Sequence, residues 1–306
     1  MKKLILINYL FLISALIANA QKEEFPKLTG PYLGQKPPEK VSELFAPEIM
    51  TSPQGYHSPI IFSPDLSEAI WRPMSEGKGD RLLFYTRQVN GIWAEPVILD
   101  FGEGFDPLDP FFSYDGKRIY FLSFHPAVQD RVERERIWYV ERQQSGWSGP
   151  KLIDDVVCQH PTHWTFSLAR NGNLYFTSEI SGSGNQDIYI SKFVGGKYQI
   201  PEKLDGGINS EGLDFTPFVA PDESYLVFAR KGPDTKKSDL YISFKSKDGS
   251  WSKAVSLGII VNSDKHDLAP YVTPDGKYLF YISQKEKMNG IHWVSTKVIE
   301  ELRPNE

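Results

Sequence analysis

Four side chains that can ligate a metal ion or transfer a proton occupy one repeated position of the sequence. They lie eight residues before an Asp or Asn that we assign to a tight turn: His57, His163, Asp214 and Asp267. Pro107 takes that place in one further copy, and other candidates flank the position: Asp106, Asp109, Trp164, Glu211 and His266. If the copies surround a common axis, one funnel collects these groups. We predict the binding residues to be His57, Asp106, Asp109, His163, Trp164, Asp214, His266 and Asp267.

The Asp and His side chains at this position could have a structural role or bind a metal ion. In the structural interpretation, Asp and His side chains bind backbone N–H groups that the same turn leaves unpaired in each copy. In the metal interpretation, the ligands of zinc or manganese are His57, His163, Asp214 and Asp267, since these ions accept imidazole and carboxylate groups. No closely spaced ligand motif is present, so we expect no cofactor and keep the metal site as an alternative.

A third interpretation is glycoside chemistry. Hydrolysis of a sugar bond needs two carboxyl groups about 5 to 9.5 Å apart. The carboxylates that could form such a pair are Asp109, Glu211, Asp214 and Asp267. No local motif separates a catalytic acid from a structural one, and the Gly-x-Ser-x-Gly motif of serine hydrolases is absent from the sequence. We therefore assign no catalytic residue and keep these four as the alternative.

The elements that would position these residues belong to an internal repeat. The turn residues recur at positions 65, 115, 171, 222 and 275, which is a period typical of repeat architectures. Pro, Asp, Asn and Gly favour the backbone conformations of short hairpin turns. A run of apolar and aromatic residues follows each turn: 69–71, 119–123, 174–178, 225–228 and 278–283. Such runs predict β-strands.

Each copy contains further strands. A third strand is predicted at 82–85, 137–140, 188–190, 240–242 and 291–294. In the first four copies a fourth strand is expected to open at Trp93–Pro96, Trp147–Pro150, Tyr198–Pro201 and Trp251–Ala254. Proline cannot donate a hydrogen bond to a sheet, which places this strand at an edge. Four strands per unit predict an all-β fold with one five-bladed β-propeller, and six blades are the alternative.

The fifth copy lacks its fourth strand. The segment 44–50 has the same aromatic-then-proline pattern and precedes the first copy. Pairing of this segment with the last blade would close the ring and remove an unpaired edge. We therefore predict that an N-terminal strand completes the fifth blade.

The N-terminus predicts export. Residues 1–20 combine two lysines, an apolar stretch and a small-residue cleavage site, as a signal peptide does. We expect an extended arm at 21–40, the propeller at 41–298 and a tail at 299–306. The mature chain is then periplasmic or secreted, with no membrane insertion after signal removal.

Composition limits the class of partner. The net charge of −5 argues against nucleic acid. Cys158 is the one cysteine, so an internal disulfide cannot form, and we expect a buried thiol.

Two copies carry a motif of a known family. The pattern Asp-x-x-Pro-x-x-(Thr/Ala)-Pro-Asp stands at 214–222 and 267–275, and Asn-Ser precedes it at 209–210 and 262–263. This pattern resembles the TolB-like, or WD-repeat-like, β-propeller repeat of exported Bacteroidota envelope proteins. The resemblance implies a propeller fold in an envelope or secreted setting. Because we find no catalytic motif and expect a closed ring of repeats, we predict a monomeric, non-enzymatic recognition or scaffold module for an envelope protein or glycan. A carbohydrate-active enzyme, either a glycosidase or a lyase, is the alternative function.

Overall fold

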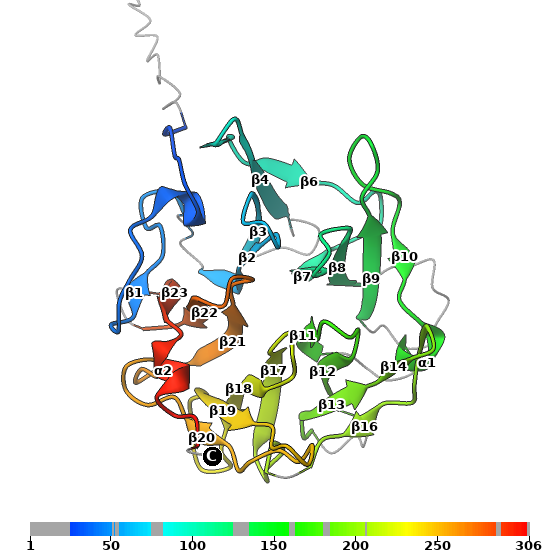
Figure 1. The fold of residues 1–306 in the computed structure, drawn as a ribbon, viewed down its shortest axis with the longest axis vertical. Helices are drawn as coiled ribbons and strands as arrows, with labels where there is room; N and C mark the ends of the chain where they lie inside the picture. Colours follow the sequence, from blue (N-terminus) through cyan, green and yellow to red (C-terminus); the bar gives the residue numbers. More distant parts are fainter. Residues whose placement is uncertain are drawn as a thin grey trace, which may run out of the picture.

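Five β-sheets surround a central axis as the blades of a propeller (Figure 1). This computed structural model describes residues 25–50, 52, 55–74, 82–124, 135–158, 163–179, 184–205, 207–285 and 289–304, without the side chains of His163 and Trp164. The predicted all-β, five-bladed fold is confirmed. The predicted signal peptide lies outside the described residues, and within the described part no helix is long and apolar enough to cross a membrane.

Each blade is an antiparallel sheet whose first strand lies nearest the axis. Blade 1 contains β2 (Tyr56–Phe62), β3 (Glu68–Pro73), β4 (Leu83–Val89), β5 (Ile92–Trp93) and β6 (Val97–Leu99). Blade 2 contains β7 (Leu108–Phe112), β8 (Arg118–Ser123), β9 (Arg136–Glu141) and β10 (Lys151–Leu152). Blade 3 contains β11 (His163–Leu168), β12 (Leu174–Ser178), β13 (Asp187–Ser191) and β16 (Glu202–Lys203), with the hairpin β14 (Phe193–Val194) and β15 (Lys197–Tyr198).

The last two blades follow the same order. Blade 4 contains β17 (Leu213–Val219), β18 (Tyr225–Lys231), β19 (Asp239–Phe244) and β20 (Val255–Ser256). Blade 5 contains β21 (Asp267–Val272), β22 (Tyr278–Ser283), β23 (Gly290–Ser295) and the N-terminal strand β1 (Glu43–Leu44). The helical segments are short: η1 (Tyr32–Gly34), α1 (Asp155–Cys158) and α2 (Lys297–Glu300).

The N-terminal strand closes the ring, as predicted. Glu43 lies opposite Trp293 in the antiparallel pair of β1 and β23. The Phe45 N–H continues the pairing by donating to the Ile291 carbonyl at 2.8 Å. The strand is shorter than the predicted segment 44–50, because Ala46 adopts a positive φ of 45° and turns the chain away. The closure hides an edge that would otherwise be free to pair with another chain.

The start of the outer strands differs from the prediction. The aromatic residue expected to open the fourth strand instead forms a tight hairpin with the end of the third strand. The cross-strand pairs are Gln88–Trp93, Arg142–Trp147, Phe193–Tyr198 and Lys245–Trp251. In blades 1 to 3 the outer strand begins after the proline, at Val97, Lys151 and Glu202. Proline has no N–H, so it lies in the link between the hairpin and the edge strand.

A bulge interrupts the pairing of each innermost strand, and three of these bulges share one backbone conformation. Asp109, Thr216 and Ala269 have φ values of 44°, 50° and 51°, and each precedes a proline. The bulge turns N–H groups toward the neighbouring blade. The Ala269 N–H donates to the Thr216 Oγ1 at 3.1 Å, and the Thr216 N–H donates to the Thr177 Oγ1 at 3.0 Å. These bonds join blades 3, 4 and 5 near the axis.

Removal of the Phe45 ring tests the closure. Phe45 is 2% exposed, and its ring centroid lies 5.0 Å from that of Phe280 and 5.1 Å from that of Trp293. We expect Phe45→Ala to lower the free energy of unfolding by about 3–5 kcal/mol in chemical denaturation, since it leaves a cavity at the joint. Phe193→Ala is the control, because Phe193 is 39% exposed and should cost about 1 kcal/mol or less. Equal losses would contradict a closure held by buried aromatic packing.

Candidate functional site

Two of the predicted binding residues meet at the end of the central channel. His57 Nδ1 lies 3.1 Å from Asp109 Oδ1, so a residue of blade 1 contacts a residue of blade 2. The Asp109 side chain is 3% exposed, and its Oδ2 atom has no hydrogen-bond partner among the described residues. The buried Ser58 Oγ atom also has none. Both residues line a cavity on the axis of about 30 Å³, which is large enough for one water molecule.

Asp214 and Asp267 hold loops rather than face an open site. Asp214 Oδ2 accepts hydrogen bonds from the Ser210 N–H at 2.6 Å and from the Ser210 Oγ at 2.7 Å, while Arg230 Nε donates to Asp214 Oδ1 at 2.6 Å. Asp267 Oδ2 accepts from the Ser263 N–H at 2.5 Å. Both carboxyl groups are fully buried, and desolvation raises the pKa of each above its usual value. This geometry matches the structural interpretation of the repeated Asp.

The Asn of the same motif extends this anchor to the preceding blade. The Asn209 side chain accepts from the Ile188 N–H at 2.7 Å and donates to the Ile188 carbonyl at 2.9 Å. Asn262 makes the same pair of bonds with Leu240, at 2.7 and 3.0 Å. The Asn-Ser-x-x-x-Asp pattern therefore fastens one blade to the third strand of the blade before it.

The other predicted residues are dispersed. The Asp106 N–H donates to Ser123 Oγ at 2.9 Å, and His266 Nδ1 lies 3.1 Å from Ser238 Oγ. Glu211 is exposed. The side chains of His163 and Trp164 lie outside the described residues, so the proposed four-residue metal site stays a prediction. Among the side chains that are described, no group of three or more His, Cys, Asp or Glu could hold a metal ion.

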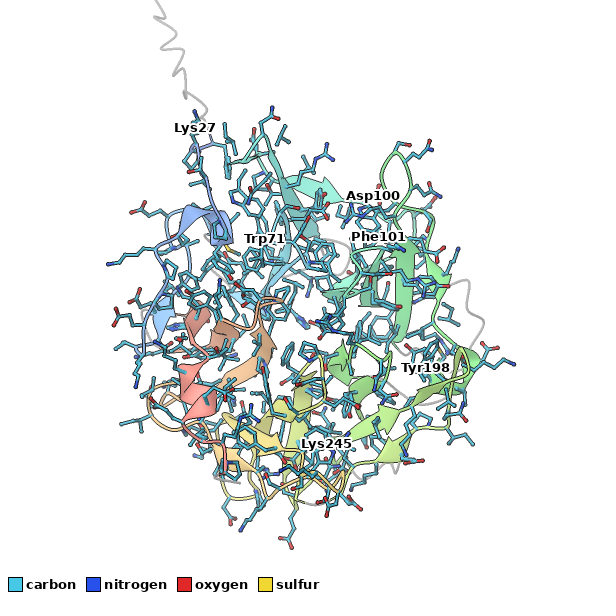
Figure 2. The ribbon with its side chains drawn as sticks, viewed as in Figure 1. Lys27, Trp71, Asp100, Phe101, Tyr198 and Lys245 are labelled. Atoms are coloured by element: carbon cyan, nitrogen blue, oxygen red, sulfur yellow. The ribbon has the colours of Figure 1, made fainter. Side chains whose placement is uncertain are left out.

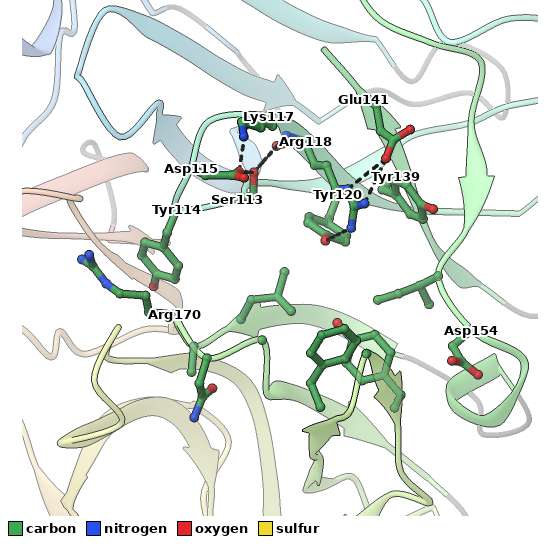
Figure 3. Close-up of a pocket in the computed structure, with 18 of the residues that line it drawn as sticks. Ser113, Tyr114, Asp115, Lys117, Arg118, Tyr120, Tyr139, Glu141, Asp154 and Arg170 are labelled. Atoms are coloured by element: carbon green, nitrogen blue, oxygen red, sulfur yellow. Dashed lines mark hydrogen bonds and ion pairs between the residues drawn. The ribbon is translucent and has the colours of Figure 1, made fainter.

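A larger groove lies between blades 2 and 3, on the side of the Asp and Asn turns (Figure 3). It has a volume of about 950 Å³. Its walls come from β8, β9, the turn before β12 and the β14–β15 hairpin, and the aromatic residues that line it are Tyr114, Tyr120, Tyr139, Phe193 and Tyr198. Tyr198 lies toward the outside of the ring (Figure 2). We call this feature the blade 2–3 groove.

A charged network fixes one wall of the groove. Arg118 donates to Glu141 Oε1 at 2.9 Å and to the Tyr120 hydroxyl at 3.4 Å, and its guanidinium carbon lies 4.7 Å from the centroid of the Tyr139 ring. Hydrogen bonds from Lys151 and Arg118 lower the pKa of Glu141, so it stays ionised. Burial raises the pKa of the phenols of Tyr120 and Tyr198, which therefore stay protonated at neutral pH. The wall presents phenol hydroxyls beside a fixed cation.

The sequence prediction missed the blade 2–3 groove. Tyr120, Tyr139 and Tyr198 belong to strands in which repeated aromatic residues indicate blade packing. One signal was present: three residues after the turn, Tyr225 and Tyr278 are aromatic, whereas blade 2 has Arg118. The same position holds Glu68 in blade 1 and Leu174 in blade 3, so a cation occurs there in blade 2 alone.

Comparison with known proteins supports the fold. No protein-family model matches the chain, and no curated protein does. Among solved structures, TolB from Acinetobacter baumannii is similar with a TM-score of 0.51 and 15% identity, over 78% of this chain and 52% of that one. A putative TolB from Agrobacterium tumefaciens has a TM-score of 0.52 and 19% identity, over 78% and 73%. The fold is a TolB-like propeller.

This TolB-like propeller spans about half of the length of the Acinetobacter structure. An endo-arabinase from Bacteroides thetaiotaomicron is also similar, with a TM-score of 0.51 and 12% identity, over 79% of this chain and 94% of that one. Identities this low show the architecture alone, since one fold hosts many activities.

Removal of the Asp214 carboxylate tests its anchoring role. We expect Asp214→Ala to lower the free energy of unfolding by about 3–5 kcal/mol, because Arg230 would lose its buried partner. Glu202→Ala is the matched control, since Glu202 forms an exposed ion pair with Lys192 that should contribute about 1 kcal/mol or less. Both values are measured by urea denaturation at neutral pH. If Asp214→Ala lowered the free energy of unfolding as little as the control does, the Asp214 carboxylate would not anchor the loop.

Proposed function

We propose that this TolB-like propeller is an exported, non-enzymatic recognition module that binds an envelope protein or glycan in the blade 2–3 groove. The observation that carries the proposal is the groove itself, which combines about 950 Å³ of space with partly exposed aromatic rings. Ligand sites are typically concave, with aromatic walls and a few fixed polar groups. The likeness to TolB structures supports the fold of such a module. Residues 1–20 would direct export.

The aromatic side chains of the groove are held in place, so a ligand can contact them with little loss of side-chain entropy. The Tyr139 ring contacts two residues of β8: its centroid lies 4.7 Å from the guanidinium carbon of Arg118 and 5.7 Å from the ring centroid of Tyr120. Phe193 lies 4.9 Å from Tyr198 on the opposite wall. Rigid aromatic residues lose little side-chain freedom on binding, and they carry a large share of the energy at many interfaces.

The proposal predicts a ligand that depends on Tyr139. Mature chain is immobilised and exposed to envelope extract of the producing organism and to a glycan array. We expect a retained ligand whose affinity falls about tenfold or more in Tyr139→Ala, because the variant loses a central ring of the groove. Tyr241→Ala is the control, as Tyr241 is equally half-buried but lies on blade 4. Equal retention by both variants, or no ligand from either source, would contradict the proposal.

A carbohydrate-active enzyme is a second candidate, and the contact between His57 and Asp109 favours it. Asp109 is buried with one carboxylate oxygen unpartnered, although the corresponding bulge residues, Thr216 and Ala269, carry no charge. The backbone therefore does not require a carboxylate there. The similar endo-arabinase shows that this architecture can house a glycosidase. Of the four alternative catalytic residues, Asp109, Glu211, Asp214 and Asp267, Asp109 is then the strongest candidate.

This second candidate predicts turnover of a polysaccharide. Wild-type protein is incubated with a panel that includes arabinan, and reducing ends are measured. We expect Asp109→Asn to lower the rate by about 10²-fold or more while the melting temperature is kept, since proton transfer commonly contributes that much. Absence of turnover on the whole panel, or full activity of the variant, would exclude this role for Asp109.

A further inference from the structure

One junction between blades is occupied by the chain's own N-terminal arm. Between blades 5 and 1, the Tyr32 hydroxyl donates to Asp275 Oδ2 at 2.7 Å, and Tyr32 is 2% exposed. Its ring centroid lies 5.4 Å from that of Phe62, 5.1 Å from Tyr278 and 5.9 Å from Trp293. A tyrosine at the start of η1 thus fills the space between two blades.

The backbone of the arm is held by the outer hairpin of blade 1. The Gly30 carbonyl accepts from Trp93 Nε1 at 2.7 Å and from Gln88 Nε2 at 3.2 Å. The Trp93 N–H donates to the Leu28 carbonyl at 2.9 Å. The arm is therefore bound along the outer hairpin of blade 1 and then turns at η1, which places the tyrosine in the junction.

The blade 2–3 groove repeats the walls of this junction. Asp115 corresponds to Asp275, and the residues three and five positions later, Arg118 and Tyr120, correspond to Tyr278 and Phe280. Tyr139 lies opposite Tyr120 in the sheet, as Trp293 lies opposite Phe280. On the facing blade, Leu168 precedes the turn as Phe62 does. All of these blade 2 and blade 3 residues line the groove.

The polar end of the groove also matches. Ser113 Oγ donates to Asp115 Oδ1 at 2.6 Å, as Thr273 Oγ1 donates to Asp275 Oδ1 at 2.7 Å. In blade 5 this arrangement leaves Oδ2 for the Tyr32 hydroxyl. In blade 2, Asp115 Oδ2 has no hydrogen bond to any described residue. Asp115 is exposed, so its Oδ2 atom can accept a hydrogen bond from a phenol of a ligand.

The other junctions are closed by side chains of the chain itself. Between blades 1 and 2, Arg142 stacks on Trp147 at 4.4 Å and forms an ion pair with Glu68. Between blades 3 and 4, Lys245 lies 5.3 Å from the Trp251 ring, which contacts Tyr175. Next to blade 4, Arg303 lies 5.0 Å from the Phe244 ring.

Blade 3 lacks the pair that closes these junctions. The hairpin positions of Arg142 and Trp147 hold Phe193 and Tyr198. Phe193 cannot pair with a carboxylate, and it packs on Tyr198 and against Gly172, where a Cβ would lie 2.8 Å from its ring. The replacement leaves the junction open and lined by aromatic residues.

We infer that the blade 2–3 groove binds a peptide segment of a partner protein that presents a tyrosine in a turn with a glycine two residues away on each side, as Gly30-Pro31-Tyr32-Leu33-Gly34 does. The tyrosine ring would pack on Tyr120, Tyr139 and Leu168, and its hydroxyl would donate to Asp115 Oδ2. This inference rests on the proposed recognition function and names its partner. The arm of a second copy does not suit the role, because Tyr32 is already buried in its own chain.

A synthetic peptide tests the inference directly. The heptapeptide of residues 29–35, acetylated and amidated, is titrated into the mature chain by calorimetry. We expect saturable binding at one site per chain, weakened about tenfold when the peptide tyrosine is replaced by phenylalanine, because one buried hydrogen bond is lost. In the protein, Tyr139→Ala and Asp115→Ala should each weaken binding about tenfold or more. Asp65→Ala, which alters the same turn in blade 1, should leave it unchanged.

Each other outcome overturns the inference. Absence of saturation at about 1 mM peptide excludes a peptide of this kind. Sensitivity to Asp275→Ala but not to Asp115→Ala would mean that the peptide displaces the arm instead. Self-association that Asp115→Ala abolishes, seen by ultracentrifugation, would assign the groove to a second copy. A glycan bound through Tyr139 without peptide binding would overturn the inference while the recognition function stands; no Tyr139-dependent ligand would remove both.

Discussion

The antiparallel pairing of β1 with β23 is the constraint on which the ring depends. Five sheets around an axis have a first and a last member, and the last would expose the unpaired N–H and C=O groups of β23 to solvent. The pairing of Glu43 with Trp293 covers that edge with residues from the other end of the chain. Phe45, which follows β1, then packs on Phe280 and Trp293, so hydrogen bonding and apolar burial act at the same joint.

The closure also explains why one junction carries an inserted segment. To reach blade 5 from the N-terminus, the arm passes the outer hairpin of blade 1 and places Tyr32 between the two blades. The other junctions are spanned by pairs such as Arg142 with Trp147. Different side chains thus occupy equivalent junctions between blades. At the blade 2–3 groove, the hairpin residues Phe193 and Tyr198 leave the junction open.

Buried carboxylates in this ring have distinct physical roles. Asp214 is compensated by Arg230 and by the Ser210 N–H, and its relative Asp267 binds the Ser263 N–H, so each joins a loop to its strand. Asp109 differs, because its one described side-chain partner is His57 and it lines a small axial cavity, while its Oδ2 atom has no hydrogen-bond partner among the described residues. Burial of a charge without full compensation is costly. Asp267 shares this feature, because its Oδ1 atom also lacks a partner among the described residues, so the contact with a histidine of another blade is what sets Asp109 apart.

The sequence by itself determined the number of blades, their strand order and the closing role of the segment near Phe45, because turns, strands and proline positions are local properties that repeat. It also indicated that the Asp of the Asn-Ser-x-x-x-Asp motif would accept backbone N–H groups. The groove was decided by the tertiary structure alone. Tyr120, Tyr139 and Tyr198 have the same residue types as packed blade residues. In the described part of blade 3, the hairpin holds Phe193 and Tyr198 where blades 2 and 4 have an Arg–Trp or Lys–Trp pair, which leaves the groove open to a ligand.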